Sequence, residues 1–156
     1  MSTEGPSATS FTSITTYLSW DHERLDRALA VACEDVEAGR MAEARGAFAE
    51  YDRGLGRHMR LEEELLFPLF EARSGMVGGP TTVMRDEHRT IRVALDLMRA
   101  GLEREDPEAF RSGVKFLQSV LPAHNSKEEH ILYPTTDRLL TERERVKFTA
   151  RLLERA

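Results

Sequence analysis

The stretch HMRLEEELLFP at residues 58–68 returns in altered form as HNSKEEHILYP at residues 124–134. Both stretches contain H-x-x-x-E followed by a second glutamate, and both end on an aromatic residue and a proline. Four residues of α-helix turn the chain direction by about 400°, so the histidine and the first glutamate lie one above the other on one helix face. Each stretch therefore predicts a helix that carries an imidazole and a carboxylate on the same side.

The two stretches belong to a larger repeat. The same offset of 66 residues (124 − 58) separates the members of three pairs, His22 with His88, His58 with His124, and Glu62 with Glu128. Apolar residues at steps of three and four run through 18–36, 48–69, 84–102 and 114–131, with the six polar residues in register among them. This pattern predicts a helical hairpin written twice, with an approximate two-fold axis between the copies.

The fold class that follows is all-α, an antiparallel four-helix bundle made of two pseudo-symmetric hairpins. Gly39 marks the end of the first helix, and the glycine-bearing residues 74–80 form the central loop. Thr141 and Glu144 have the spacing of a capping box and predict a short C-terminal helix. Residues 1–12 read as a disordered lead, and residues 13–156 as one domain.

Composition narrows the functional classes. The chain has 156 residues and a net charge of −5, without a basic stripe for nucleic acid. It has no run of about 20 apolar residues to cross a membrane and no secretory signal. Cys33 is the single cysteine, so no intrachain disulfide forms. We therefore expect a cytoplasmic protein that binds neither nucleic acid nor membrane; its oligomeric state does not follow from the sequence.

The polar residues on the core-facing stripes indicate a metal site. An unpaired ionised carboxylate in a core costs several kcal/mol, which a bound cation would offset. Imidazole and carboxylate donors suit iron, manganese or zinc, and the lack of thiolates disfavours an iron–sulfur cluster. The predicted metal ligands are His22, His58, Glu62, His88, His124 and Glu128. Pseudo-symmetry places one ion on His22 and His58 and the other on His88 and His124, with both glutamates bridging.

These motifs resemble the hemerythrin-like HHE cation-binding domains. The resemblance rests on four segments that span nearly the whole chain after the lead: DHERL at 21–25, HMRLEEELLFP at 58–68, DEHRTI at 86–91 and HNSKEEHILYP at 124–134. It implies a non-haem di-iron centre, with an oxo or hydroxo bridge, that meets dioxygen, nitric oxide or peroxide. The oxygen-carrying hemerythrins use five histidines and an aspartate among the bridging carboxylates, whereas this chain looks like the subgroup with four histidines and two glutamates.

Neighbouring residues receive weaker assignments. Glu63 and Glu129 are expected to be solvated or to support the ligands, and His130 points about 120° away from the ligand face, toward solvent. Gly56 and Pro122 correspond at the offset of 66, so they mark either a bend near the metals or a coincidence. None of these residues is predicted to bind metal.

Two classes of function stay open on this sequence. One is a redox-active di-iron protein that handles dioxygen, peroxide or nitric oxide, because two histidines and two shared carboxylates leave each ion below six-coordinate. The other is a non-catalytic module that senses, binds or stores oxygen or iron. The sequence assigns no catalytic residue and shows no further cofactor.

Overall fold

The computed structural model describes residues 11–156, and this part of the chain is helical without strands. Residues 1–10 of the expected lead lie outside the described residues. The helical segments are α1 (Ile14–Glu37), α2 (Met41–Leu61), η1 (Glu62–Leu66), α3 (Phe67–Ser74), α4 (Pro80–Glu103), α5 (Pro107–Gln118), α6 (Leu121–Lys127), η2 (Glu128–Leu132), α7 (Tyr133–Arg138) and α8 (Glu142–Arg155).

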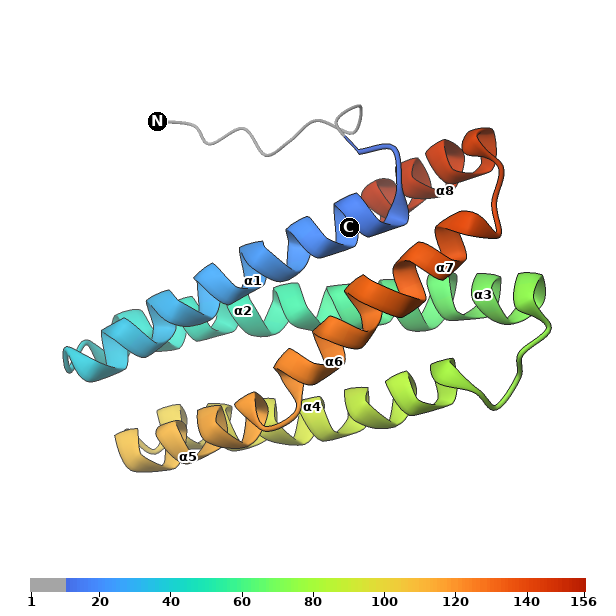
Figure 1. The fold of residues 1–156 in the computed structure, drawn as a ribbon. Helices are drawn as coiled ribbons and strands as arrows, with labels where there is room; N and C mark the ends of the chain where they lie inside the picture. Colours follow the sequence, from blue (N-terminus) through green and yellow to red (C-terminus); the bar gives the residue numbers. More distant parts are fainter. Residues whose placement is uncertain (1–10) are drawn as a thin grey trace.

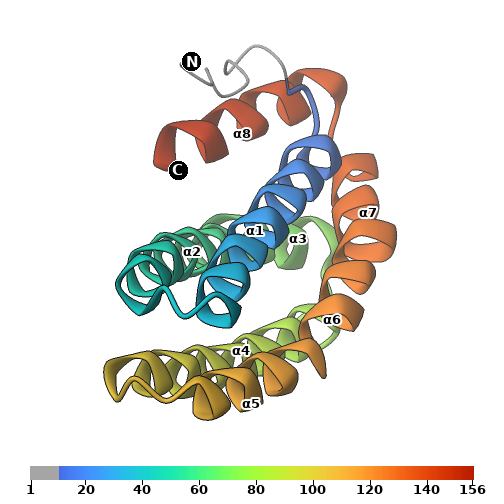
Figure 2. The same ribbon diagram turned by 90° about the vertical axis from the view of Figure 1, so that its left-hand side faces the viewer.

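The segments join into four long helical arms and one short helix. Figures 1 and 2 show how the arms lie beside one another. The arms are α1, then α2 continued through η1 into α3, then α4, then α5 continued through α6 and η2 into α7. α1 packs against α2, and α4 against α5, which are the two predicted hairpins. α8 packs on α1 at the end where α1 begins. The predicted bundle with a short C-terminal helix is confirmed, and Thr141 and Glu144 form the expected capping box.

The fourth arm is interrupted between α5 and α6, next to Pro122, where the sequence left a bend open. Ser119 and Val120 form a turn, and Pro122 stands in the first turn of α6, where its missing N–H costs no helical hydrogen bond. Gly56, its counterpart at the offset of 66, lies inside α2, and the helix continues through it without interruption. The two positions therefore share no structural role.

Each glutamate of an H-x-x-x-E pair begins a π-helical turn. Phe67 N–H donates to the Glu62 carbonyl, and Tyr133 N–H donates to the Glu128 carbonyl, each over five residues. The extra residue in such a turn shifts the side chains that follow it around the helix. The predicted core stripe is wrong at its last position for this reason, because Ile131 is 58% exposed and Leu132 is buried instead.

Two apolar clusters form the core, one on each side of the polar residues. The first lies toward the α1–α2 and α4–α5 connections and includes Leu25, Leu55 and Ile91. The second lies toward α3, α7 and α8 and includes Leu18 and Met84. The histidines lie between the clusters along the chain, so apolar packing at both ends fixes the helices that carry them.

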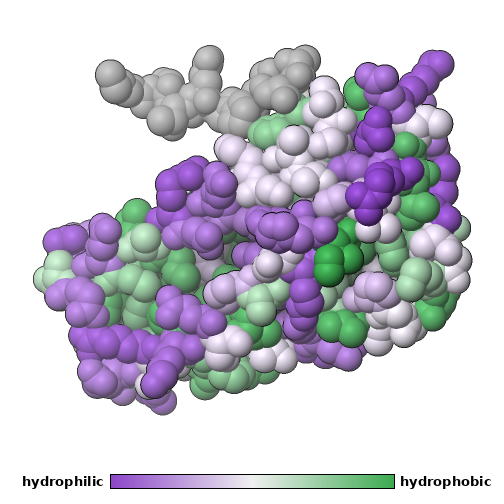
Figure 3. Space-filling view, in the orientation of Figure 1, coloured by the Kyte–Doolittle hydropathy of each residue, from purple (hydrophilic) through white to green (hydrophobic). Residues whose placement is uncertain are grey.

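No helix of residues 11–156 could span a membrane. None of these helices combines the length and the apolar composition needed to cross a bilayer. The face in Figure 3 shows hydrophilic side chains with smaller hydrophobic areas between them.

Candidate metal centre

The structure brings all six predicted ligands together at the middle of the bundle. Each comes from a different segment, and each is at most 4% exposed. Their donor atoms form two overlapping groups, each within 4.8 Å. The groups are His22, His58 and Glu128, and then His88, His124, Glu62 and Glu128.

The histidines pair as the pseudo-symmetry predicts. The ring centroids of His22 and His58 are 4.6 Å apart, and those of His88 and His124 are 4.9 Å apart. The first pair joins α1 to α2, and the second pair joins α4 to α6. The geometry is therefore that of two neighbouring two-histidine sites.

The glutamates lie between the two pairs. Glu62 Oε1 is 3.5 Å from His58 Nε2 and 3.3 Å from His88 Nε2. Glu128 Oε1 is 3.3 Å from the His22 Nε2 and 3.2 Å from the His124 Nε2. Each carboxylate thus contacts one histidine of each pair, which is the placement that a bridging ligand requires.

A carboxylate holds the outer nitrogen of every histidine. Asp21 lies 2.9 Å from Nδ1 of His58, a histidine of the first hairpin. Glu63 lies 2.9 Å from Nδ1 of His88, a histidine of the second hairpin. Because a carboxylate accepts, Nδ1 is the protonated nitrogen and Nε2 presents a lone pair to the centre of the site. This is the tautomer that binds a metal ion through Nε2.

The other two contacts repeat the same arrangement. Glu87 lies 3.0 Å from His124 Nδ1, and Glu129 lies 2.9 Å from His22 Nδ1. Glu63 and Glu129 therefore support the predicted ligands. Asp21 and Glu87 were missed, although each directly precedes a predicted histidine and the two correspond at the offset of 66.

Tyr133 is a third residue of the site that was not predicted from the sequence. Its hydroxyl donates to Glu62 Oε2 at 2.6 Å and to Glu128 Oε1 at 3.1 Å. The same oxygen lies 3.2 Å from His22 Nε2 and 3.3 Å from His58 Nε2. The available signal was the tyrosine that ends the second motif, where the first motif ends on Phe67.

The electrostatics of the protein alone favour a bound cation. Burial lowers the pKa of His22 and His88, but the neighbouring carboxylates, Glu128 beside the first and Glu62 beside the second, outweigh it and raise each pKa to about 9. Burial and the charge of Glu128 raise the pKa of Glu62. Burial and the charges of Glu128 and Glu62 raise the pKa of the Tyr133 phenol. Protons thus take the place that a metal ion would fill.

Three buried polar atoms of the site have no hydrogen-bond partner, and a bound metal ion would take the partner's place. Glu62 Oε1, His88 Nε2 and Glu128 Oε2 are buried without a hydrogen-bond partner. A buried polar atom without a partner costs about 1–3 kcal/mol, more when it is charged. Imidazole nitrogens and carboxylate oxygens are the donors that iron, manganese and zinc accept, so the residues fit such an ion.

The remaining predicted positions lie away from the centre. His130 is exposed, and its Nδ1 lies 2.9 Å from the Ser126 carbonyl oxygen, which agrees with its expected surface position.

A polar pocket of 370 Å³ opens beside the site, and His22 and Glu129 form part of its wall. It gives small molecules an approach to the edge of the site.

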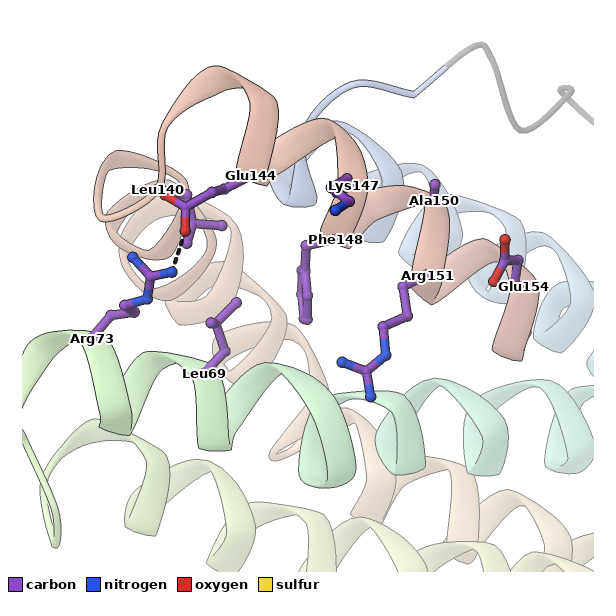
Figure 4. Close-up of a pocket in the computed structure, with 9 residues that line it drawn as sticks. All are labelled: Leu69, Arg73, Leu140, Glu144, Lys147, Phe148, Ala150, Arg151 and Glu154. Carbon is purple, nitrogen blue, oxygen red and sulfur yellow. Dashed lines mark hydrogen bonds and ion pairs between the residues drawn. The ribbon is translucent and has the colours of Figure 1, made fainter.

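A second hollow, of 570 Å³, lies between α3 and α8 (Figure 4). Leu69, Leu140 and Phe148 line it, and an ion pair between Arg73 and Glu144 crosses one end. None of the six predicted ligands contributes to its wall.

Comparison with known proteins agrees with this geometry. The chain is 32% identical over 118 residues to the iron-sulfur cluster repair protein YtfE of Edwardsiella ictaluri (strain 93-146). The alignment covers 68% of this chain and 53% of that protein, so the chain spans about half of the relative's length. No solved structure matches significantly. The hemerythrin HHE cation-binding domain matches residues 13–136, and the chain belongs to that family.

Proposed function

We propose that this protein holds a non-haem di-iron centre and uses it to react with dioxygen, peroxide or nitric oxide. The observation that carries the proposal is the convergence of four Nε2 atoms and two carboxylates in a core position, with each carboxylate lying between two histidine pairs. Two ions bound by shared carboxylates explain that placement better than one ion does.

The residues of the chain set the conditions for this chemistry. His22 and His58 would hold one iron, His88 and His124 the other, and Glu62 and Glu128 would bridge them. Asp21, Glu63, Glu87 and Glu129 fix the rings and raise the basicity of their Nε2 atoms. When bound, two irons supply the one- and two-electron redox steps that the protein side chains lack.

The site also limits which molecules can react. The apolar clusters on both sides exclude bulk water and bulky substrates from the bundle core. The pocket beside His22 leads small molecules to the edge of the site. The six proposed ligands are at most 4% exposed, which favours ligands as small as dioxygen, peroxide and nitric oxide at the centre itself.

The test begins with iron content. Protein reconstituted with iron should hold two iron atoms per chain by elemental analysis. A content that stays at one or below would overturn the dinuclear assignment.

The reactivity is tested by anaerobic reduction followed by titration with air under a spectrophotometer. We expect oxidation to a stable diferric form, which then reacts with peroxide, while the diferrous form reacts with nitric oxide. A spectrum that reverts each time oxygen is removed would show reversible carriage instead, and the function would be oxygen storage.

A second candidate function is a part in iron–sulfur cluster repair. It is favoured by the similarity to the protein from Edwardsiella ictaluri that carries this name. If it holds, the iron-loaded chain should restore a cluster enzyme damaged by oxidation, and the Glu62→Ala variant should not. Equal recovery with both proteins would exclude this role.

A further inference from the structure

The two halves of the metal centre differ at one pair of positions. Tyr133 and Phe67 correspond at the offset of 66 and both directly follow a π-helical turn. The Phe67 ring stacks on His88 with its centroid 5.5 Å away and offers no donor atom. The Tyr133 hydroxyl reaches the centre of the site, on the side of His22 and His58.

Three distances around the Tyr133 oxygen are those between ligands of one metal ion, and the fourth and shortest, 2.6 Å to Glu62 Oε2, is a hydrogen bond. Bonds of about 2.1 Å from a metal to nitrogen and oxygen place adjacent ligands of an octahedron about 3.0 Å apart. The Tyr133 oxygen lies 3.2 Å from His22 Nε2, 3.3 Å from His58 Nε2 and 3.1 Å from Glu128 Oε1. These three atoms belong to the three residues of the first donor group.

The same donor group is one residue smaller than the other. Histidine and carboxylate residues supply three members around His22 and His58, but four around His88 and His124. Tyr133 is wholly buried and lies within hydrogen-bond distance of all three members of the smaller group. Glu62 Oε1 also lies 3.5 Å from His58 Nε2, so Tyr133 stands where a further ligand of that ion would be, beside the two histidines and the two bridging glutamates.

We propose that Tyr133 binds, through its phenol oxygen, only the iron held by His22 and His58, so that the two irons are chemically different. This inference rests on the di-iron function proposed above. Binding to ferric iron breaks the Oη–H bond and forms an Oη–Fe bond; the proton passes to solvent, and no electron is transferred. The iron held by His88 and His124 would then have one protein ligand fewer.

The experiment uses the ferric, iron-reconstituted full chain. A phenolate bound to ferric iron gives a visible charge-transfer band, and excitation in that band enhances the phenolate ring modes in the Raman spectrum. We expect these modes in the wild-type protein and a shift of them when the tyrosines are ring-deuterated. Tyr133→Phe should remove the band and the modes while the protein still takes up iron.

The chain supplies a matched control. It has three tyrosines, and Tyr51 is also buried, with a hydroxyl that has no hydrogen-bond partner. The Tyr17→Phe and Tyr51→Phe double variant leaves Tyr133 as the single tyrosine and should keep the band at full intensity. This variant decides the question even where Tyr133→Phe fails to fold.

The outcomes separate this inference from the proposed function. Wild-type protein with two irons and no phenolate modes would overturn the ligation by Tyr133 and leave the di-iron centre standing. Loss of the modes in the double variant, or their survival in Tyr133→Phe, would also overturn it. Iron uptake of one atom or less would overturn the di-iron function, and the inference with it.

Discussion

At the scale of single residues, the six proposed ligands differ sharply from the fifth histidine. Replacing Glu62 or Glu128 by alanine should lower the iron content from two atoms per chain to one or none, because each carboxylate lies between both histidine pairs. His130→Ala should leave it at two, because His130 is exposed and turned away. Elemental analysis of the three variants decides this, and equal losses in all three would contradict the proposed ligand set.

The carboxylates that accept from the histidine Nδ1 atoms should also affect metal affinity. Asp21→Asn removes the charge that orients His58, and removal of such a partner costs roughly 10- to 100-fold in metal affinity. Competition with a chelator measures the affinity. Asp96→Asn is the control, because Asp96 forms the same i,i+3 ion pair with arginine that Asp21 forms, but at the surface. A similar affinity for both variants would argue against an orienting role.

The positions of the six proposed ligands were easier to predict from the sequence than the residues that surround them. His22, His58, Glu62 and their counterparts were predictable because their offset and helical spacing are properties of the chain alone. The Asp21 contact joins α1 to α2, and the Tyr133 contacts join α7 to α1, α2 and η1, so both depend on how the helices pack. Spacing along one helix carries no information about such contacts.

At the scale of helices, one close approach should be sensitive to a single methyl group. A Cβ added at Gly101 of α4 would lie 2.6 Å from the Phe110 backbone nitrogen in α5. Gly101→Ala should therefore lower the free energy of unfolding by about 1–3 kcal/mol, since the backbone must shift. Gly46→Ala, in α2 with nothing within 4 Å, should instead raise it by about 0.5–1 kcal/mol. Denaturant titration of both variants tests this, and equal effects would contradict the packing argument.

The helices also show where periodicity alone was insufficient. The bundle, its two hairpins and α8 follow from apolar spacing and capping residues, which act locally. The π-helical turns at Glu62 and Glu128 do not, because their extra residue is accepted only when packing and the site favour it. Ile131 shows the consequence, since a regular 3.6-residue period places it in the core and the structure exposes it.

At the scale of the whole molecule, the buried histidines of the proposed metal centre couple stability to pH. In the metal-free fold the pKa of His22 and of His88 is raised from 6.5 to about 9. The stability that these protonated rings contribute is fully present below pH 6.5 and is lost as the pH rises toward 9. Bound metal ions replace the protons, so the metal-loaded protein does not depend on them.

The metal-free protein should therefore lose thermal stability between pH 6.5 and 9, whereas the iron-loaded protein should change little. A tenfold change in proton affinity is worth about 1.4 kcal/mol, so the loss amounts to a few kcal/mol. The difference in melting temperature between the two forms should widen as the pH rises, because buried carboxylates then face neutral imidazoles without a cation. Differential scanning calorimetry of both forms across this range measures it. A metal-free protein that is as stable as the loaded one at pH 9 would mean that the six buried groups need no cation.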